Sequence, residues 1–516
     1  MQGGVLIVDF GAQYCQLIAR RIREMGVYSR ITVPERAKRM CEALRPRAII
    51  LSGGPNSVYE EDAPTLPTEM LEMGIPVLGI CYGMQWMTRA LGGGVQGAGD
   101  EREYGRTEIM IEAGAPGGLF EGLDGSRTVW MSHGDSVDRL PTGFEVLARS
   151  EPCPFAAIAD PERKLYAIQF HPEVTHTQDG ERMLQNFVLN IAGCPPDWSP
   201  GDIVEQKVEA IRQLVGETGE VVLGLSGGVD SSVAAVLIHR AIGKRLHCVF
   251  VDNGLLRERE RDGVESLFRD DYHMDLHIVD AGERFLGELS GVEEPEAKRK
   301  IIGRVFVDVF REFASGLEHC GFLGQGTLYP DVIESVAAHG GSTQTIKSHH
   351  NVGGLPEDLD LELVEPLRDL FKDEVRALGR ELGLPSSLVD RQPFPGPGLA
   401  VRCLGEVTEE RLAPLRRADA IVRQEIEARG LHEALWQYFA VSLPVRSVGV
   451  MGDARTYENA CVLRVVSSDD AMTADWEYLP VDVLQRISNR IINEVKGLNR
   501  VCLDISSKPP STIEWE

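Results

Sequence analysis

Short apolar runs recur along the first 192 residues, separated by turns rich in glycine and proline and by stretches with helical spacing. Runs of four to eight apolar residues between turn signals are typical of buried strands. Strands that alternate with helices in this way predict an α/β layer fold. The expected strands are Val5–Val8, Ala48–Leu51, Val77–Ile80 and Tyr166–Phe170.

The same alternation returns beyond residue 200. A buried strand is expected at Val221–Leu225, a helix at Ser231–Ile242 that ends at Gly243, and another strand at Leu246–Val251. A strand, a helix and a second strand in this order form a βαβ unit with parallel strands. The fold class predicted for the chain is therefore α/β, with two doubly wound domains.

The pattern changes after residue 398, where helices and strands no longer alternate regularly. In the last expected helix, apolar side chains fall on one face, Pro480 precedes the first turn and Gly497 follows the last. We expect a small C-terminal α+β domain. Its expected elements are helices at Glu409–Arg429 and Val481–Val495, with Leu484, Ile487, Ile491 and Val495 facing inward, and strands at Ser447–Met451, Cys461–Val466 and Val501–Ile505.

Two segments rich in proline and glycine mark the domain boundaries. Gly193–Gly201 contains three prolines and two glycines, and a second break covers Asp390–Gly398. Neither a helix nor a central strand continues through such a segment. The predicted division is a first domain at 1–192, a linker at 193–200, a second domain at 201–390 and a third at 391–516.

Composition and charge limit the classes of partner that we expect the chain to bind. With 79 acidic and 53 basic residues among 516, the formal net charge is −26, which opposes the basic surface used for nonspecific nucleic-acid binding. A local nest of amides is still able to bind a small phosphorylated ligand. No apolar run approaches the roughly 18 residues that span a bilayer. We expect neither a nucleic-acid partner nor a membrane.

The ten cysteines are scattered singly, without a CxxC pair and without a His/Cys cluster at zinc spacing. This pattern favours neither a disulfide framework nor a structural zinc site. A reducing cytoplasm is the expected location.

One cysteine, Cys81, lies between an expected strand and an expected helix. Gly79–Gly83, with Cys81 at its centre, follows an expected strand and precedes a helix-like run. A nucleophile on such a strand-to-helix elbow projects from a strained corner, and the helix N-terminus favours the thiolate. The alternative interpretation is a buried structural cysteine in a tight turn.

A nucleophilic cysteine needs a base, and the base needs an orienting partner. His171 and Glu173 follow an expected strand and, two residues apart in extended backbone, point to the same face. Ser52–Pro55, after another strand, is able to offer backbone N–H groups to an oxyanion. Taken singly, the histidine is more often structural and the glycine pair only a turn.

The segments Gly79–Gln85 and His171–Glu173 resemble those of class I glutamine amidotransferases. In that family the cysteine forms a glutamyl thioester and releases ammonia. Trp130–Asp135 resembles a family loop near the substrate, and a surface loop is the alternative. The resemblance implies Cys81, His171 and Glu173 as the catalytic triad, Gly54 and Tyr82 as donors of oxyanion amides, and Gln85 as a glutamine-binding residue.

A second constellation begins where the strand at 221–225 ends. Two adjacent glycines and a helix N-terminus present amides to an anion, and two serines add hydroxyls. The Gly-Lys-[Ser/Thr] ending of a Walker loop is absent, and an N-capping turn is the alternative. The segment comprises Ser226, Gly227, Gly228, Val229, Asp230, Ser231 and Ser232.

This loop resembles the signature of the ATP pyrophosphatases, which cleave ATP between its α and β phosphates and adenylate a substrate oxygen. The resemblance implies ATP as co-substrate and Asp230 as a ligand for Mg²⁺ or pyrophosphate. Lys372 matches a family lysine that contacts ATP phosphates, although a solvated helix lysine is the more common interpretation of the sequence alone.

An amidotransferase followed by an adenylating domain is typical of an amination enzyme. Along essentially the whole chain the order of domains is similar to the GMP synthetase family, including stretches such as Pro393–Leu399 and Lys508–Glu516. The resemblance implies a homodimeric ligase of purine nucleotide biosynthesis that converts xanthosine 5′-monophosphate (XMP), ATP and glutamine to GMP, AMP, pyrophosphate and glutamate. Its expected XMP-binding residues are Arg304, Gln437, Arg500, Lys508, Ile513 and Glu514.

Two other classes of function compete with this interpretation. A different amidotransferase ligase would keep both sites and change the acceptor, and only the C-terminal half argues against it. A nonenzymatic nucleotide sensor would keep both folds without catalysis. The intact Cys81, His171 and Glu173 and the intact loop at 226–232 argue against the sensor.

Overall fold

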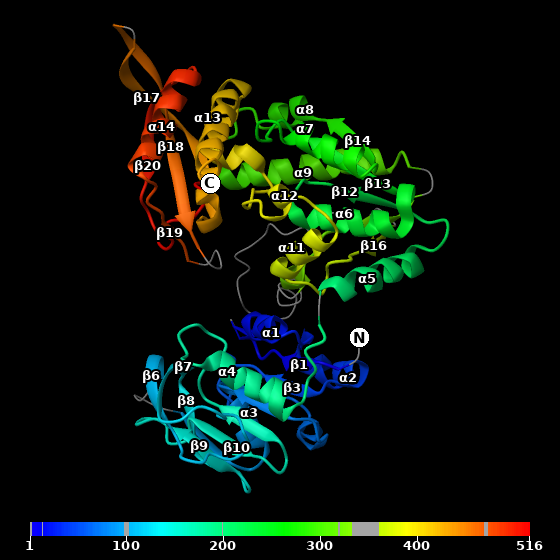
Figure 1. Cartoon of the computed structure of the whole chain (residues 1–516), viewed down its shortest axis with the longest axis vertical. Helices are drawn as coiled ribbons and strands as arrows, with labels where there is room; N and C mark the ends of the chain where they lie inside the picture. Colours follow the sequence, from blue (N-terminus) through cyan, green and yellow to red (C-terminus); the bar gives the residue numbers. More distant parts are fainter. Residues whose placement is uncertain are drawn as a thin grey trace. The chain divides into compact units, whose positions relative to one another are not determined.

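The computed structural model describes residues 3–12, 14–97, 103–198, 200–317, 320–332, 361–451, 453–468 and 473–516, without the side chains of 200–202 and 451. The chain forms two compact units, Met1–Ser199 and Pro200–Glu516, which are described separately below (Figure 1). No helix among the described residues is long and apolar enough to cross a membrane.

Unit 1 is built on a nine-stranded mixed sheet in the order β2-β1-β3-β4-β11-β10-β9-β6-β7. The first five strands are parallel, and all four residues of β1, β3, β4 and β11 are buried, which explains their continuous apolar sequences. They are β2 (Ser29–Thr32), β1 (Val5–Val8), β3 (Ala48–Leu51), β4 (Val77–Ile80) and β11 (Leu165–Ile168). The expected strands are confirmed, the last one shifted toward the N-terminus.

The other four strands of this sheet are antiparallel to their neighbours, and sequence patterning did not predict them. β6 alternates buried and exposed positions, so it lacks a continuous apolar run. A separate two-stranded sheet pairs β5 with β8. The bounds are β10 (Ala157–Asp160), β9 (Glu145–Arg149), β6 (Glu103–Ile111), β7 (Ser126–His133), β5 (Gly94–Gly97) and β8 (Asp135–Arg139).

The helices of unit 1 connect and cover the parallel strands. Two of them, α3 and α4, follow the segments that carry Cys81 and the pair His171 and Glu173. They are α1 (Cys15–Glu24), α2 (Pro34–Leu44), α3 (Tyr82–Ala90) and α4 (Gly180–Gln185), which continues as the π-helix η2 (Asn186–Ile191); η1 (Thr68–Glu72) is a short 3-10 helix.

Unit 2 contains a five-stranded parallel sheet in the order β14-β13-β12-β15-β16. Figure 1 shows α5, α6 and α11 on one side of it and α9 on the other, which is the predicted doubly wound arrangement. The strands are β14 (Asp275–Asp280), β13 (Leu246–Asp252), β12 (Glu220–Gly224), β15 (Cys320–Gly324) and β16 (Glu362–Val364). The helices are α5 (Pro200–Val215), α6 (Val229–Ile242), α7 (Glu260–Glu265), α8 (Gly282–Glu288), α9 (Pro295–Ala314), α11 (Lys372–Glu381) and α12 (Ser386–Val389).

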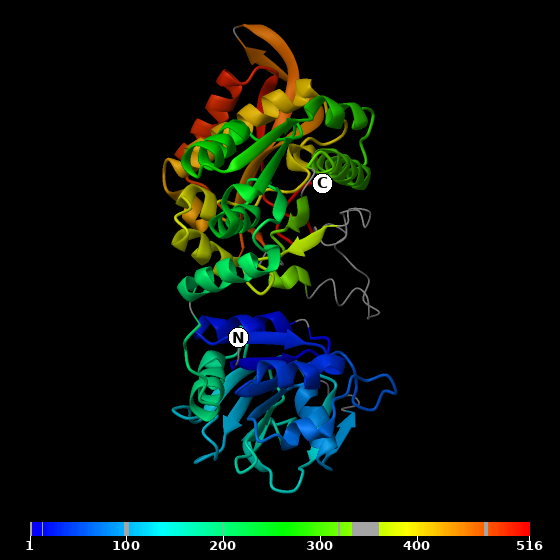
Figure 2. The ribbon, with the colours of Figure 1, turned by 90° about the vertical axis from the view of Figure 1, so that its right-hand side faces the viewer.

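The C-terminal part of unit 2 packs two helices on a second sheet. Its main feature is the antiparallel hairpin of β17 and β18, longer than the strands expected from the sequence, and Figure 2 shows this hairpin extending beyond the helices. β20 pairs with β18 in parallel, and β19 pairs with the end of β18. The bounds are α13 (Glu409–Glu427), β17 (Gln437–Met451), β18 (Ala454–Ser467), β19 (Asp475–Trp476), α14 (Val481–Glu494) and β20 (Leu498–Asp504).

One apolar core runs through both parts of unit 2. It joins Val222 and Val249 of the parallel sheet to Leu412 of α13 and Ile487 of α14. On α14, Ile487 and Ile491 are buried as the periodicity predicted, and Val483 is buried as well, whereas Leu484 is only partly buried. The continuous core makes the predicted second and third domains a single compact unit.

Candidate active sites

Cys81 lies at the elbow between β4 and α3 and has a strained backbone. Its φ of 50° and ψ of −106° are unusual for a residue other than glycine. The flanking glycines are required by close packing: a Cβ on Gly79 would lie 2.8 Å from atoms of Gly83, and a Cβ on Gly83 would lie 2.4 Å from the Leu51 carbonyl oxygen. The predicted elbow is confirmed as a structural feature.

His171 and Glu173 form a buried pair beside this cysteine. Nδ1 of His171 lies 2.7 Å from Oε1 of Glu173. Burial by itself lowers the pKa of His171, but the negative charge of Glu173 and the hydrogen bonds with Cys81 and Glu173 raise it to about 10. This environment favours the protonated imidazole of His171.

The loop after β3 approaches the same place. A Cβ on Gly53 would lie 3.1 Å from Cε1 of His171 and 3.6 Å from Cβ of Cys81, whereas a Cβ on Gly54 would lie 2.7 Å from the Phe10 carbonyl oxygen. Tyr82 is the first residue of α3, so its N–H has no acceptor within the helix. The loop after β3 and the start of α3 therefore both border Cys81.

Gln85 is buried and is held by the protein itself. Its Nε2 donates to the Asp135 carbonyl oxygen at 2.7 Å and lies 3.5 Å from Oε1 of Gln169. Sequence reasoning missed one further neighbour of the thiol: Nε2 of Gln169 lies 3.6 Å from Cys81 Sγ. The carbonyl oxygen of Ser132, in the segment Trp130–Asp135 that resembles a family loop near the substrate, lies 3.4 Å from the same sulfur. Gln169 was identifiable by its place on the segment that carries His171.

The loop at 226–232 connects β12 to α6, as predicted. Gly227 has a φ of +73°, and its Cβ position would be 3.0 Å from Val264. Oγ of Ser231 accepts from the Ser226 N–H at 3.2 Å, and Oγ of Ser232 donates to the Gly228 carbonyl oxygen at 2.7 Å. These hydrogen bonds hold the loop in place directly before α6, where the N–H groups of the first helical turn are available to an anion.

Asp230 and Lys372 meet at this loop. Nζ of Lys372, at the start of α11, lies 3.3 Å from Oδ2 of Asp230. Burial raises the pKa of Asp230 and Asp331 adds to this, while Lys372 and Arg376 oppose it. Among the described residues, Oδ1 of Asp230 has no hydrogen-bond partner. The structure thus places Lys372 beside the loop at 226–232, while its side chain stays 48% exposed to solvent.

A third group of predicted residues gathers around the end of the chain. Glu514 forms a two-pronged ion pair with the buried Arg402, at 3.0 and 2.8 Å, and Nε2 of Gln437 lies 3.4 Å from Oε1 of Glu514. Ile513 is buried, and its carbonyl oxygen accepts from the buried Arg464 at 3.4 Å. The structure therefore brings Gln437, Ile513 and Glu514 together.

The remaining predicted XMP-binding residues have other surroundings. Arg304 is exposed on α9 and pairs with Glu288 at 2.8 Å. Arg500 is exposed on β20 and lies 3.5 Å from the Val448 carbonyl oxygen. Lys508 exchanges two backbone hydrogen bonds with Ala474, at 2.7 and 3.1 Å.

Sequence reasoning also missed an arginine cluster next to Gln437 and Glu514. Arg257 and Arg402 both stack on Phe394, at 4.0 and 5.3 Å from the ring centre. Burial lowers the pKa of Arg257 to about 9, and its Nε and Nη2 have no hydrogen-bond partner among the described residues. Buried donors of this kind suit an anionic ligand. The only sequence signal was the proline-rich segment that contains Phe394.

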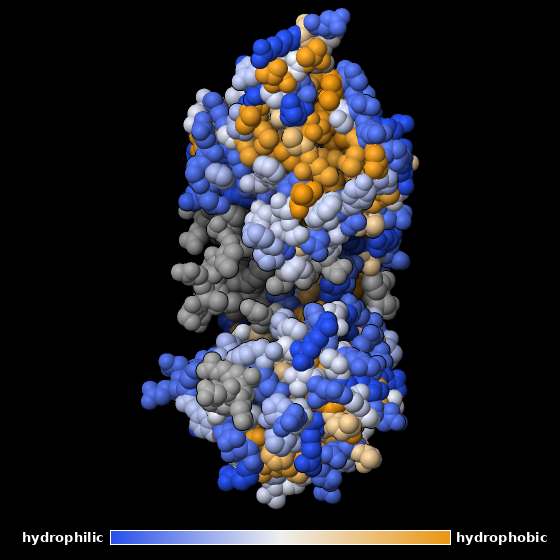
Figure 3. Space-filling view, turned by 90° about the vertical axis from the view of Figure 1, so that its left-hand side faces the viewer, coloured by the Kyte–Doolittle hydropathy of each residue, from blue (hydrophilic) through white to orange (hydrophobic). Residues whose placement is uncertain are grey.

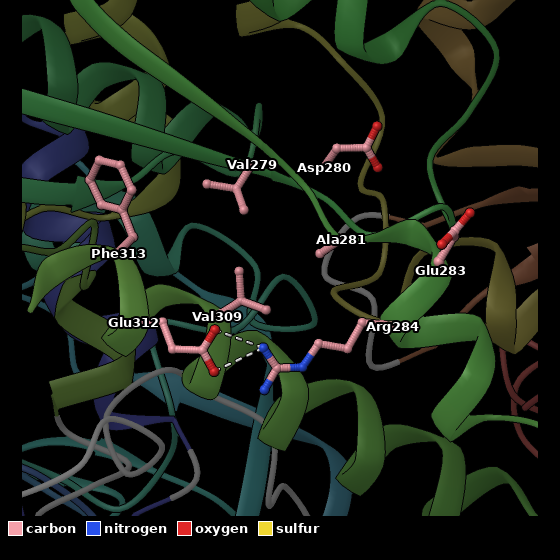
Figure 4. Close-up of a pocket in the computed structure, with 8 residues that line it drawn as sticks. All are labelled: Val279, Asp280, Ala281, Glu283, Arg284, Val309, Glu312 and Phe313. Carbon is pink, nitrogen blue, oxygen red and sulfur yellow. Dashed lines mark hydrogen bonds and ion pairs between the residues drawn. The ribbon is translucent and has the colours of Figure 1, made fainter. Parts of the chain in front are cut away.

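Figure 4 shows a separate open pocket of about 620 Å³ between the end of β14, α8 and α9. Arg284 reaches across it to both carboxylate oxygens of Glu312, each at 2.9 Å. Its lining includes none of the residues predicted for either site. The pocket is therefore distinct from the loop at 226–232 and from the arginine cluster.

An α/β unit that carries a cysteine elbow with a buried His-Glu pair defines a glutamine amidotransferase. Residues 6–191 match the family model described as "Glutamine amidotransferase class-I". Residues 203–262 match the model "NAD synthase", and residues 424–515 match "GMP synthase C terminal domain".

Curated relatives match the whole chain. One is "GMP synthase [glutamine-hydrolyzing]" of Maridesulfovibrio salexigens, 58% identical over 99% of both chains. Proteins of the same name from Brachyspira hyodysenteriae and Clostridium novyi are 57% and 56% identical, again over 99% of both chains. The chain belongs to the glutamine-hydrolysing GMP synthase family. The predicted family, fold class, ligase activity and use of ATP are thereby confirmed.

Proposed function

We propose that the chain adenylates XMP with ATP at the loop 226–232 and replaces the activated oxygen with ammonia released at Cys81. The observation that carries this proposal is the pair of separate sites. Unit 1 holds a thiol beside a buried His171–Glu173 pair, and unit 2 holds an amide-rich loop with Lys372 at Asp230. The products are GMP, AMP, pyrophosphate and glutamate.

In unit 1, Cys81 Sγ attacks the side-chain amide carbon of glutamine. His171 holds the thiol proton and passes it to the leaving ammonia, while Glu173 holds the imidazole through Nδ1 at 2.7 Å. Amides of Gly54 and Tyr82 stabilise the oxyanion. Water then hydrolyses the glutamyl thioester, and His171 takes the proton of that water.

In unit 2, the amides at the start of α6 bind the phosphates of ATP. The oxygen on C2 of XMP attacks the α-phosphorus, and pyrophosphate leaves. Ammonia then attacks C2, and AMP leaves with the former oxygen of XMP. Lys372 at 3.3 Å from Asp230 is placed to neutralise phosphate charge.

The chemistry of Asp230 fits Mg²⁺. This ion prefers carboxylate oxygens and phosphates, and Oδ1 of Asp230 is buried without a hydrogen-bond partner among the described residues. When bound, Mg²⁺ supplies positive charge to the departing pyrophosphate. We propose Asp230 as its protein ligand.

We place XMP at the arginine cluster and the end of the chain. Gln437 and Glu514 offer polar groups to the purine, and Lys508 offers charge to its phosphate. Arg304 and Arg500 lie in other surroundings in this structure and are proposed as XMP contacts from the family resemblance alone. Glu514 is already oriented by Arg402 at 2.8 Å. The buried Ile513, next to Glu514 in the chain, offers an apolar contact to the purine.

We propose a homodimer formed through the β17/β18 hairpin. Figure 3 shows apolar side chains gathered on this part of unit 2. Val445, Val448, Val450 and Tyr457 on the hairpin are between 45% and 75% exposed. Exposed apolar patches of this kind mark protein interfaces, and a second copy closes such a patch by two-fold symmetry. Val450→Glu should yield a monomer by light scattering, and Leu214→Glu on α5 should not.

The proposed division into parts 1–192, 201–390 and 391–516, with a linker at 193–200, is a division of function, because the last two parts share one core. The proposed location is cytoplasmic. All ten cysteines are free thiols, which supports a reducing compartment. The net charge of −26 argues against a nucleic-acid partner.

The deciding experiment incubates the protein with ATP, Mg²⁺, glutamine and one acceptor nucleotide at a time. XMP should drive formation of AMP and GMP in equal amounts. AMP formation driven by a different nucleotide, with none from XMP, would reject the proposed acceptor. Glutamate release without any AMP would reject the adenylation site.

A further inference from the structure

Three buried side chains, far apart in the sequence, meet on the antiparallel side of unit 1. Glu103 begins β6, His133 ends β7, and the two residues are register partners across these strands. Cys153 lies in the connection between β9 and β10. Glu103, His133 and Cys153 are 8%, 4% and 1% exposed. One possible ligand atom from each lies within 4.8 Å of the other two.

The polar atoms of this cluster lie close to one another but form no hydrogen bond of good geometry among themselves. Nδ1 of His133 lies 3.0 Å from the Asp135 carbonyl oxygen, which only accepts, so Nδ1 carries the hydrogen. Nε2 lies 3.1 Å from Oε2 of Glu103. Among the described residues, neither Nε2 nor either carboxylate oxygen of Glu103 has a partner of hydrogen-bond geometry. Leaving a buried carboxylate in this state is costly.

We propose that Glu103, His133 and Cys153 bind one divalent cation of borderline softness, with Zn²⁺ as the best fit. Zinc takes Cys, His and Glu ligands, and three protein ligands leave a fourth position open. A thiolate and a carboxylate together balance the double positive charge. The Nδ1 contact of His133 with a carbonyl oxygen is the supporting hydrogen bond that metal-bound histidines usually make.

The position of the cluster gives the cation a role in the amidotransferase unit. Ser132, the neighbour of His133 on β7, presents its carbonyl oxygen to Cys81 Sγ at 3.4 Å. The Asp135 carbonyl oxygen that faces His133 also accepts from Gln85 at 2.7 Å. A cation at His133 therefore holds the segment 132–135 that borders the thiol. It acts as a positioning element and does not touch the reacting atoms.

The test uses the full-length chain with Cys81→Ala, because Cys81 and His171 offer a competing thiol and imidazole. The protein is stripped with a chelator, and Co²⁺ is added as a spectroscopic substitute for zinc. We expect a sulfur-to-cobalt charge-transfer band that is lost in Cys81→Ala/Cys153→Ala. The matched control Cys81→Ala/Cys194→Ala, which removes another buried cysteine of unit 1, should keep the band.

A second cluster, His247, Asp275 and His277, lies on β13 and β14 of unit 2. It contains no sulfur, so the charge-transfer band separates the two sites. Glu103→Gln, which keeps the shape of the side chain, should weaken Zn²⁺ binding measured by calorimetry at least about 10-fold. No sulfur band, or a band of unchanged intensity in the Cys153 variant, would overturn the proposal. If the Cys153 variant does not fold, the Glu103→Gln variant decides: an unchanged Zn²⁺ affinity in that variant would overturn the proposal.

Discussion

Nζ of Lys372 lies 3.3 Å from Oδ2 of Asp230, although 142 positions separate the two residues. Lys372 opens α11 and Asp230 lies in the first turn of α6, so the contact joins the loop at 226–232 to the helix whose lysine matched the family's phosphate-contacting lysine. The pair unites the positive and negative groups that an ATP-cleaving site requires.

Asp230→Ala should abolish AMP and pyrophosphate production with either glutamine or ammonium as nitrogen donor. The reason is that activation of XMP precedes amination and depends on charge stabilisation at this loop. Pyrophosphate release at saturating ATP and XMP is the measurement. Glutamate release in unit 1 serves as the control for folding. Near-normal pyrophosphate release would contradict the role given to Asp230.

Cys81→Ala should abolish GMP formation from glutamine and leave GMP formation from added ammonium salts. Only the source of ammonia depends on the thiol. Both rates are measured on the same preparation, with Cys194→Ala as the control for loss of a buried cysteine. Loss of the ammonium-dependent reaction in a folded Cys81 variant would reject the division of labour between the two units.

Lys508→Ala should raise the KM for XMP by about 10-fold or more and leave the KM for ATP nearly unchanged. A charge-assisted phosphate contact is worth about 1.5 to 3 kcal/mol. The tail is docked rather than frayed: the buried Arg464 donates to the carbonyl oxygens of Ser506 and Thr512 at 2.6 and 3.2 Å. The measurement is steady-state kinetics with each nucleotide varied in turn. Lys496→Ala, which removes another surface lysine, is the control for a general effect of losing a positive charge. Equal changes in the KM for XMP and the KM for ATP would contradict a contact between Lys508 and the XMP phosphate.

Glu173→Gln should lower the pKa of His171 from its value of about 10, because the negative charge that raises it is removed. A raised pKa in the folded state stabilises the fold fully below the ordinary pKa of 6.5, and this contribution is lost as pH rises toward 10. In the variant, that loss should occur at lower pH. Denaturation measured across this range shows the shift, and the exposed Glu151→Gln should retain the original profile. Identical profiles of stability against pH for Glu173→Gln and Glu151→Gln would exclude Glu173 as the cause of the raised pKa of His171.

Gly83→Ala should destabilise unit 1 and suppress glutamate release, because the new Cβ would lie 2.4 Å from the Leu51 carbonyl oxygen. Overpacking of this kind costs about 1 to 3 kcal/mol. The control is Gly303→Ala on α9, where no atom lies within 4 Å of the added carbon. It should be neutral or stabilising by up to about 1 kcal/mol. A Gly83 variant as stable as wild type would show that the elbow accommodates a side chain.

The sequence by itself determined the buried parallel strands and the loops that follow them. Val5–Val8, Ala48–Leu51 and Val77–Ile80 are buried on both faces, so each is a continuous apolar run that requires no knowledge of its neighbours. Local chemistry also identified Cys81 and the loop at 226–232, because the turn from a strand to a helix is encoded within a few residues.

Only the tertiary structure decided which distant residues meet. Strands β6 and β7, which carry Glu103 and His133, alternate buried and less buried positions and form no continuous apolar run. A search for zinc spacing in the sequence therefore did not find the cluster of Glu103, His133 and Cys153. Lys372 at Asp230 and Arg402 at Glu514 are likewise joined by packing. The physical reason is that helical and strand periodicity are local properties of the chain, whereas the pairing of charges depends on how sheets and helices pack together.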